Sequence, residues 1–225
     1  MKQKFLLASV VVLLISLTTK AQIGKGSVWL GGNIGYGSSR STGVSPINNP
    51  SSYAKSNSFW IAPAIGKAVK DNLILGISLT YQNVHYSNYA QYEKDNENYY
   101  GAGFFVRQYV PVLNRLYLFG QGNINFRYSK SEADLNSNYP SNTHNETKGW
   151  SAGLGFQPGV SFALNKKWQL ETGFNNLLSV QYQSTKETSN YVQYNGKNQQ
   201  FSAGLNLDNA SSFYVGFRIL LNSKG

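Results

Sequence analysis

The sequence contains no cysteine among its 225 residues. A disulfide-stapled secreted domain, a thiolate metal site and a lipid anchor attached through a thiol are therefore excluded. Acidic residues are also scarce, with 10 Asp and Glu against 20 Lys and Arg. One local acidic cluster, Glu93, Asp95 and Glu97, lacks the glycine and the final bidentate acid of a calcium loop. The sequence therefore predicts no metal site and no cofactor.

Long apolar runs are missing as well. The longest, residues 5–17, has about 13 residues, whereas a membrane-spanning helix needs about 20. It follows a basic start and precedes Thr19-Lys20-Ala21, which offers a small-x-small cleavage site. We therefore predict a signal peptide at residues 1–21 and a mature domain at residues 22–225, the alternative being a retained anchor helix. Because no later run suits a helix, any membrane-spanning part must be a β-barrel.

The mature chain is basic. Residues 1–21 hold three lysines and no acid, so a net charge of about +7 remains after their removal. An exported chain rarely meets nucleic acid, and we predict no nucleic-acid partner. Anionic lipid headgroups and lipopolysaccharide phosphates are the expected partners of such a charge.

Residues 59–82 form a predicted hairpin around a short polar turn at 69–72. In its second strand Leu73, Leu75, Ile77 and Leu79 alternate with small or polar residues. One face is thus apolar and the other polar, as in a soluble sandwich or in a membrane barrel with lipid outside. Similar alternation predicts further strands at residues 27–36, 99–110, 116–128, 149–162, 168–182 and 201–221. Asp208-Asn209-Ala210-Ser211 interrupts the last stretch, and a turn there would give nine strands instead of eight.

The connections between these strands alternate in length. Predicted loops centre near residues 46, 92, 138 and 190, and short turns centre near residues 70, 113 and 165. This order is typical of a barrel in the outer membrane of a Gram-negative bacterium, with periplasmic turns and longer outside loops. We therefore predict an all-β fold, an eight-stranded antiparallel up-and-down transmembrane β-barrel with both chain ends in the periplasm.

Three segments carry a resemblance to a known family: the signal peptide, IAPAIGKAVKDNLILGISLTY and FFVRQYVPVLNRLYLFGQGNINF. They look like the outer-membrane β-barrel (porin-like) proteins of Bacteroidetes, and the size is similar to that of small OmpA/OmpX-type barrels. The resemblance implies assembly by the barrel-insertion machinery. The chain departs from such barrels at its end, where Asn222-Ser223-Lys224-Gly225 replaces a final aromatic residue.

Charged residues on the predicted lumen face are Arg107, Arg127, Glu171 and Arg218, with Asp208 as a further candidate. A charge inside a narrow barrel must be paired or hydrated. We predict a structural network centred on Glu171, with a selectivity ring as the alternative. Eight strands leave an interior that side chains nearly fill, so no general diffusion pore is expected.

The sequence holds two histidines. His144 falls in a predicted polar loop, whereas His85 shares the outer-rim face of its strand with Ser87. A histidine beside a serine can act as its general base when a third group orients the ring. The segment His85-Tyr86-Ser87-Asn88 is similar to the His-x-Ser-Asn segment of lipid A deacylases, but the sequence identifies no carboxylate partner. A rim histidine in an aromatic belt is the simpler interpretation.

Six lysines lie in or beside the long loops and predict a basic rim that contacts lipopolysaccharide: Lys55, Lys94, Lys130, Lys148, Lys186 and Lys197. No complete catalytic constellation is visible. The sequence therefore favours a non-enzymatic barrel with a structural, surface-binding or adhesion role and an unidentified surface ligand. A narrow channel for small solutes is the alternative, and a lipid A-modifying hydrolase using His85 and Ser87 is a third hypothesis.

Overall fold

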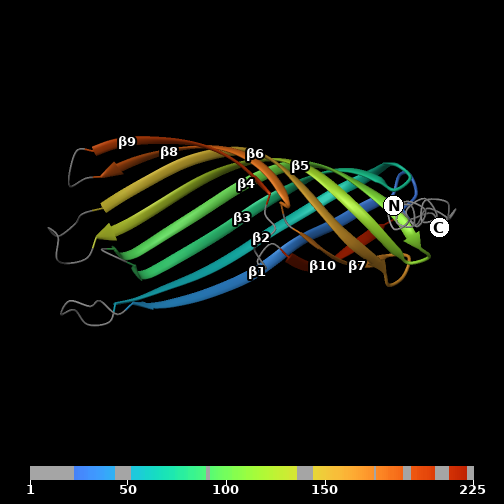
Figure 1. Cartoon of the computed structure of the whole chain (residues 1–225), viewed down its shortest axis with the longest axis horizontal. Coiled ribbons are helices and arrows are strands. Elements are labelled where there is room, and N and C mark those ends of the chain that lie inside the picture. Colours follow the sequence, from blue (N-terminus) through green and yellow to red (C-terminus); the bar gives the residue numbers. More distant parts are fainter. Residues whose placement is uncertain are drawn as a thin grey trace, which may run out of the picture.

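The fold was analysed in a computed structural model that describes residues 23–43, 52–89, 92–135, 144–174, 176–189, 194–205 and 213–221. Ten strands run along one barrel, and the short connections at residues 71–72, 114–115 and 164–167 lie together at one end, the turn end (Figure 1). The strands are β1 (Val28–Gly43), β2 (Ser52–Lys70), β3 (Leu73–Tyr89), β4 (Tyr92–Leu113), β5 (Leu116–Leu135), β6 (His144–Ala163), β7 (Trp168–Phe174), β8 (Leu178–Ser189), β9 (Tyr194–Leu205) and β10 (Phe213–Leu221). In these ranges no helix has the length and apolar character of a membrane span.

The strands close into a ring of antiparallel neighbours. Each of β1 to β5 pairs with the next strand, β6 pairs with both β7 and β8, and β10 pairs with β7 and β1. Closure uses the pairs Val28↔Leu221, Trp29↔Leu220 and Leu30↔Ile219. Strands β7 and β8 follow one another along one position of the ring, and β9 and β10 do so along the next. The ten strands therefore occupy eight positions. The predicted eight-stranded antiparallel barrel is confirmed.

Two strands that the sequence predicts to be continuous are divided in the structure. The predicted strand at residues 168–182 is interrupted between β7 and β8, where Asn176 has a positive φ of 50°. The predicted strand at residues 201–221 is divided into β9 and β10. Asp208 and the possible turn at residues 208–211 lie outside the described residues.

The strands also extend further toward the loop end than predicted. Residues 88–98, 129–147 and 183–198 were expected to be loops, yet β3 to β6, β8 and β9 run through most of them. In these extensions both faces carry polar residues, so the two-residue apolar alternation that marks a lipid-facing strand is absent. Backbone pairing continues nevertheless, through pairs such as Val84↔Glu97 and Lys130↔Lys148.

Apolar side chains cover the outside of the barrel below these extensions. Ile77 is 49% exposed and is paired with Ile65 on β2 and Phe104 on β4, which are also exposed. On the side away from the short turns, this band is bordered by aromatic residues, one on each of eight strands: Tyr36, Phe59, Tyr81, Tyr100, Tyr128, Trp150, Tyr182 and Phe201. An apolar outer band bordered by aromatic side chains is the surface that a membrane barrel presents to lipid.

Tight turns and the N-terminal segment close the other end. Asp71 and Asn72 connect β2 to β3, and Asn72 adopts φ 61°, a conformation that asparagine tolerates in two-residue hairpins. Ile23 is fully buried, and its carbonyl accepts a hydrogen bond of 2.9 Å from the Asn72 amide. The buried core gathers at this end: Ile23, Trp29, Ala68, Ile74, Phe105, Tyr109, Tyr117, Phe119, Ala163 and Leu220.

Candidate functional site

Glu171 lies at the centre of a buried ionic cluster inside the barrel. Its Oε2 atom is 2.7 Å from Arg107 Nη1 and 3.0 Å from Arg218 Nε. The three side chains come from β7, β4 and β10 and are 1%, 2% and 3% exposed, respectively. Alternation turns all three inward, because their sequence neighbours on each strand face the outside. One carboxylate therefore pairs with two guanidinium groups.

Neighbouring side chains complete the environment of Arg107. Its Nε donates to Gln121 Oε1 at 2.8 Å, and its Nη1 also donates to the Tyr109 hydroxyl at 3.0 Å. Tyr109 in turn donates to Glu171 Oε1 at 2.6 Å and accepts from Trp29 Nε1 at 3.1 Å. The Arg107 guanidinium carbon lies 4.7 Å from the Trp29 ring centre and 4.4 Å from that of Phe119. Cation–π contacts of this kind stabilise a desolvated guanidinium.

Arg218 holds the join between β1 and β10. Its Nη1 donates to the carbonyls of Gly32 and Phe217 at 3.0 and 2.9 Å. A Cβ atom at Gly31 would lie 2.5 Å from the Trp29 ring and 2.7 Å from Arg218 Cδ, so a larger residue there would force both side chains to move. The ionic cluster packs on the apolar core at the turn end, because the Arg107 guanidinium lies over the rings of Trp29 and Phe119.

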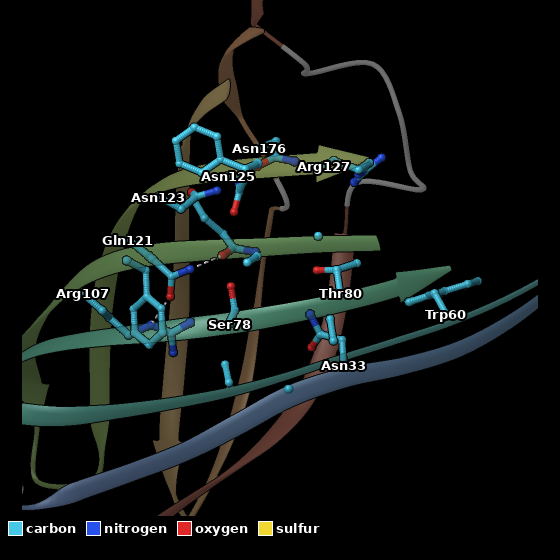
Figure 2. A pocket seen from close by; sticks show the side chains of 18 of the residues that line it. Asn33, Trp60, Ser78, Thr80, Arg107, Gln121, Asn123, Asn125, Arg127 and Asn176 are labelled. Atoms are coloured by element: carbon cyan, nitrogen blue, oxygen red, sulfur yellow. Dashed lines mark hydrogen bonds between the residues drawn. The ribbon is translucent and has the colours of Figure 1, made fainter. Parts of the chain in front are cut away.

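Above the ionic cluster lies a cavity of about 480 Å³, which we call the cup. Arg107 lies at its floor, and Arg127 and Trp60 lie toward the other end (Figure 2). Trp29 and Arg218, which also line the cup, belong to the floor because Trp29 stacks on Arg107 and Arg218 shares Glu171 with it. Figure 2 also shows Asn33, Ser78 and Gln121 projecting into the same space. Seven amide side chains line the cup: Asn33, Gln82, Gln121, Asn123, Asn125, Gln157 and Asn176.

Arg127 stands apart from the other predicted lumen charges. It lies six positions beyond Gln121 on β5 and stacks at 5.6 Å over the Tyr99 ring. Trp60, at the same end, lies flat against β1 because Gly35 leaves room for it; a Cβ at Gly35 would be 2.0 Å from the indole. The structure thus brings Arg107, Glu171 and Arg218 together and leaves Arg127 near the cup's upper end.

His85 and Ser87 meet a third residue that the sequence did not identify. His85 Nε2 lies 3.2 Å from Ser87 Oγ, and His85 Nδ1 lies 2.8 Å from Asn96 Oδ1 on β4. Both contacts are consistent with the tautomer that carries its proton on Nδ1. The triplet lies on the outer wall, on the same strand face as Leu79 and Tyr81 but beyond the aromatic border. The side chain of His144 lies outside the described residues.

The six loop-side lysines fall on the strand extensions. Lys130 contacts Glu132 and lies 3.2 Å from Glu146, and Lys148 lies 2.8 Å from Glu146. The hydrogen bond from Lys148 lowers the pKa of Glu146. Two of the six lysines therefore already face acidic partners, whereas Lys55, Lys186 and Lys197 are exposed. The expected contact with lipopolysaccharide stays a prediction, which a binding assay in detergent would test.

A metal centre would need several ligands close together. Across the described ranges, no group of three His, Asp or Glu side chains is placed to hold a metal ion.

Two solved structures of other proteins resemble this chain at low sequence identity. A search of curated proteins gives no match. The outer membrane protein OprG from Pseudomonas aeruginosa matches with 14% identity and a TM-score of 0.48, over 90% of this chain and 99% of that protein. The ferric yersiniabactin uptake receptor FyuA from Yersinia pestis matches with 12% identity and a TM-score of 0.39, over 84% of this chain. The match spans 31% of the receptor's length.

The family comparison covers most of the chain. The family model described as the outer membrane protein beta-barrel domain matches residues 7–217. That range includes all ten strands except the last four residues of β10. The chain therefore belongs to the family of outer membrane protein beta-barrel domains.

Proposed function

We propose that this outer-membrane barrel is a non-enzymatic surface-binding protein whose lumen is closed to solutes. The observation that carries the proposal is the buried cluster of Glu171, Arg107 and Arg218 directly beneath the cup. The 2.7 Å ion pair between Glu171 and Arg107 crosses the lumen from β7 to β4, and the 3.0 Å pair between Glu171 and Arg218 joins the neighbouring strands β7 and β10. An eight-position barrel is narrow enough for such side chains to fill it.

Both ends of the interior fit this role. At the turn end, the buried Ile23 packs in the same apolar core as Ile74 and Leu220. Toward the loop end the interior is hollow, and the cup there is lined by polar side chains such as Thr80, Asn125 and Arg127. A barrel that is filled below and hollow above suits binding from the cell surface better than passage across the membrane.

The proposal predicts an electrically silent barrel. Purified protein reconstituted into planar lipid bilayers should give no stepwise conductance, whereas a general porin reconstituted at the same protein-to-lipid ratio should. Conductance steps whose frequency rises with the amount of this protein would instead support the narrow-channel alternative and overturn the closed-lumen proposal.

The cellular setting follows from the sequence. We infer export through a signal peptide at residues 1–21, insertion into the outer membrane of a Gram-negative bacterium, and short turns in the periplasm. The resemblance noted above favours a member of the Bacteroidetes as the source. Cleavage after Ala21 is checked by sequencing the N-terminus of the mature protein.

The contacts among Ser87, His85 and Asn96 support a second candidate, an acyl hydrolase. In that reaction Ser87 Oγ would attack an ester carbonyl while its proton passes to His85 Nε2, and the departing alcohol would take that proton. Water would then cleave the acyl-serine. Asn96 Oδ1 would hold the imidazole in the required tautomer, as asparagine does in Cys-His-Asn proteases. Lys55, exposed and directly paired with Ser87 in the ladder between β2 and β3, is a candidate for stabilising the oxyanion.

Hydrolysis is tested with the purified barrel, using p-nitrophenyl butyrate and lipopolysaccharide as substrates. If the triplet is catalytic, Ser87→Ala should remove ester cleavage and the loss of acyl chains seen by mass spectrometry of lipid A. Ser38→Ala, at another outward hydroxyl hydrogen-bonded to an asparagine, is the matched control and should keep full activity. Equal rates for wild type, Ser87→Ala and buffer would dismiss this candidate.

A further inference from the structure

We propose that the cup binds a small, hydroxyl-rich anion, such as a sugar acid, with the charged group toward the arginines of its floor. This inference rests on the proposed surface-binding function and names the class of ligand. It follows from the charge of the lining, from the hydrogen-bonding groups above the floor and from the size of the cavity.

The lining is positively charged. Three arginines, Arg107, Arg127 and Arg218, line the cup, and the described residues around it include no acid. The nearby carboxylate of Glu171 is shared by Arg107 and Arg218, so among the described residues one positive charge of this buried cluster has no counter-charge. Burying an uncompensated charge is costly, and an anion at the floor would remove that cost.

Arg127 adds a further positive charge near the opening. It stacks over Tyr99, and within the described residues no carboxylate lies at ion-pairing distance from it. A narrow, low-dielectric cleft lined by one sign of charge concentrates ions of the opposite sign. Arg127 would therefore draw an anion in, and the floor would hold it.

The remaining lining favours hydroxyl groups over apolar surface. Amides such as Asn33, Asn123 and Asn125 offer both donors and acceptors, and Ser78 and Thr80 add hydroxyls. Asn123 lines the cup, and its buried Oδ1 has no hydrogen-bond partner within the described protein. Trp60 provides a flat ring against which a sugar can pack. At about 480 Å³ the cup is within the ordinary range for small-ligand sites.

Calorimetric titration of the full mature barrel in detergent tests the inference. The probes are glucuronate, neutral glucose, and acetate, which has the charge without the hydroxyls. We expect the Kd for glucuronate to be lower than that for either of the others by about tenfold or more, the gain expected from one hydrogen bond to a charged group. Raising the salt concentration should weaken glucuronate binding.

Two substitutions locate the site. Arg127→Gln removes a positive charge near the opening, and Asn125→Asp places a negative charge on the wall with little change of shape. Each should raise the Kd for glucuronate by about tenfold. Lys166→Gln changes the net charge as Arg127→Gln does, but in the exposed turn between β6 and β7, and should leave the Kd unchanged.

Several results would overturn the inference: no glucuronate binding, equal affinity for glucose or acetate, or wild-type affinity in both cup variants. Heat-modifiable gel migration shows first that each variant is folded. Conductance of the same preparation separates the two proposals. If the barrel conducts no ions and does not bind glucuronate, only the proposed anion site is wrong. If the barrel conducts ions, the proposed closed lumen is wrong.

Discussion

Replacing Glu171 with glutamine is expected to lower the free energy of unfolding by about 3–5 kcal/mol, the usual cost of breaking a buried ion pair from one side. The substitution keeps the shape of the side chain but leaves Arg107 and Arg218 buried, at 2% and 3% exposure, with no anionic partner. It also removes the charge that accepts the 2.6 Å hydrogen bond from Tyr109. Reversible urea unfolding in phospholipid vesicles, followed by tryptophan fluorescence, measures the change.

Glu132→Gln supplies the matched control, because it removes a carboxylate that pairs with Lys130 in an exposed position. Exposed pairs contribute about 0–1 kcal/mol, so this variant should unfold almost as the wild type does. If Glu171→Gln also stayed within 1 kcal/mol of the wild type, the ionic cluster would not be holding β4, β7 and β10 together. The buried charges would then have to be hydrated rather than paired.

The membrane-facing part of the fold could be predicted from the sequence because lipid imposes a simple pattern. Residues such as Leu75, Ile77 and Leu79 must all be apolar, while their neighbours face the lumen and need not be. The alternation of long and short connections then gave the direction of each strand. Neither the apolar alternation nor the lengths of the connections depends on which residues pair across strands.

The strand extensions could not be predicted in the same way. Above the aromatic border, β3 and β4 leave the lipid, so nothing forces an apolar face, and their polar residues look like a loop. Their backbone groups remain paired all the same, for example between His85 and Asn96. The sequence did not identify Asn96 as a partner of His85, because residues 88–98 were expected to form a loop.

The ionic cluster was only partly predictable. Alternation placed Arg107, Glu171 and Arg218 on the lumen side. Which of them touch depends on how far each strand is shifted along its neighbours around the barrel. Arg107 and Glu171 are 64 residues apart in sequence and meet across the barrel. Asp208, also assigned to the lumen, is outside the described residues, and Arg127 lies higher on its strand. The contributions of Tyr109 and Trp29 needed the register between strands, which no local pattern reveals.

Replacing Ile77 with arginine tests whether the outer band faces lipid. Ile77 lies midway between the turn at Asn72 and the aromatic border at Tyr81, and its cross-strand partners Ile65 and Phe104 are apolar and exposed. An arginine at the middle of a bilayer costs a transmembrane barrel about 2–4 kcal/mol. We therefore expect Ile77→Arg to lower the free energy of unfolding by this amount in phospholipid vesicles.

The same substitution at Val69, beside the turn, shows whether the cost of an outward arginine depends on its depth in the bilayer. Val69 is 37% exposed and close to the end of the barrel, where an arginine can reach headgroups and the cost falls to about 0–1 kcal/mol. In a soluble sandwich, Ile77 at 49% exposure would face water, and an arginine there would cost no more than one at Val69. Equal stabilities of Ile77→Arg and Val69→Arg would therefore contradict a lipid-facing band, because only a bilayer makes the penalty depend on depth.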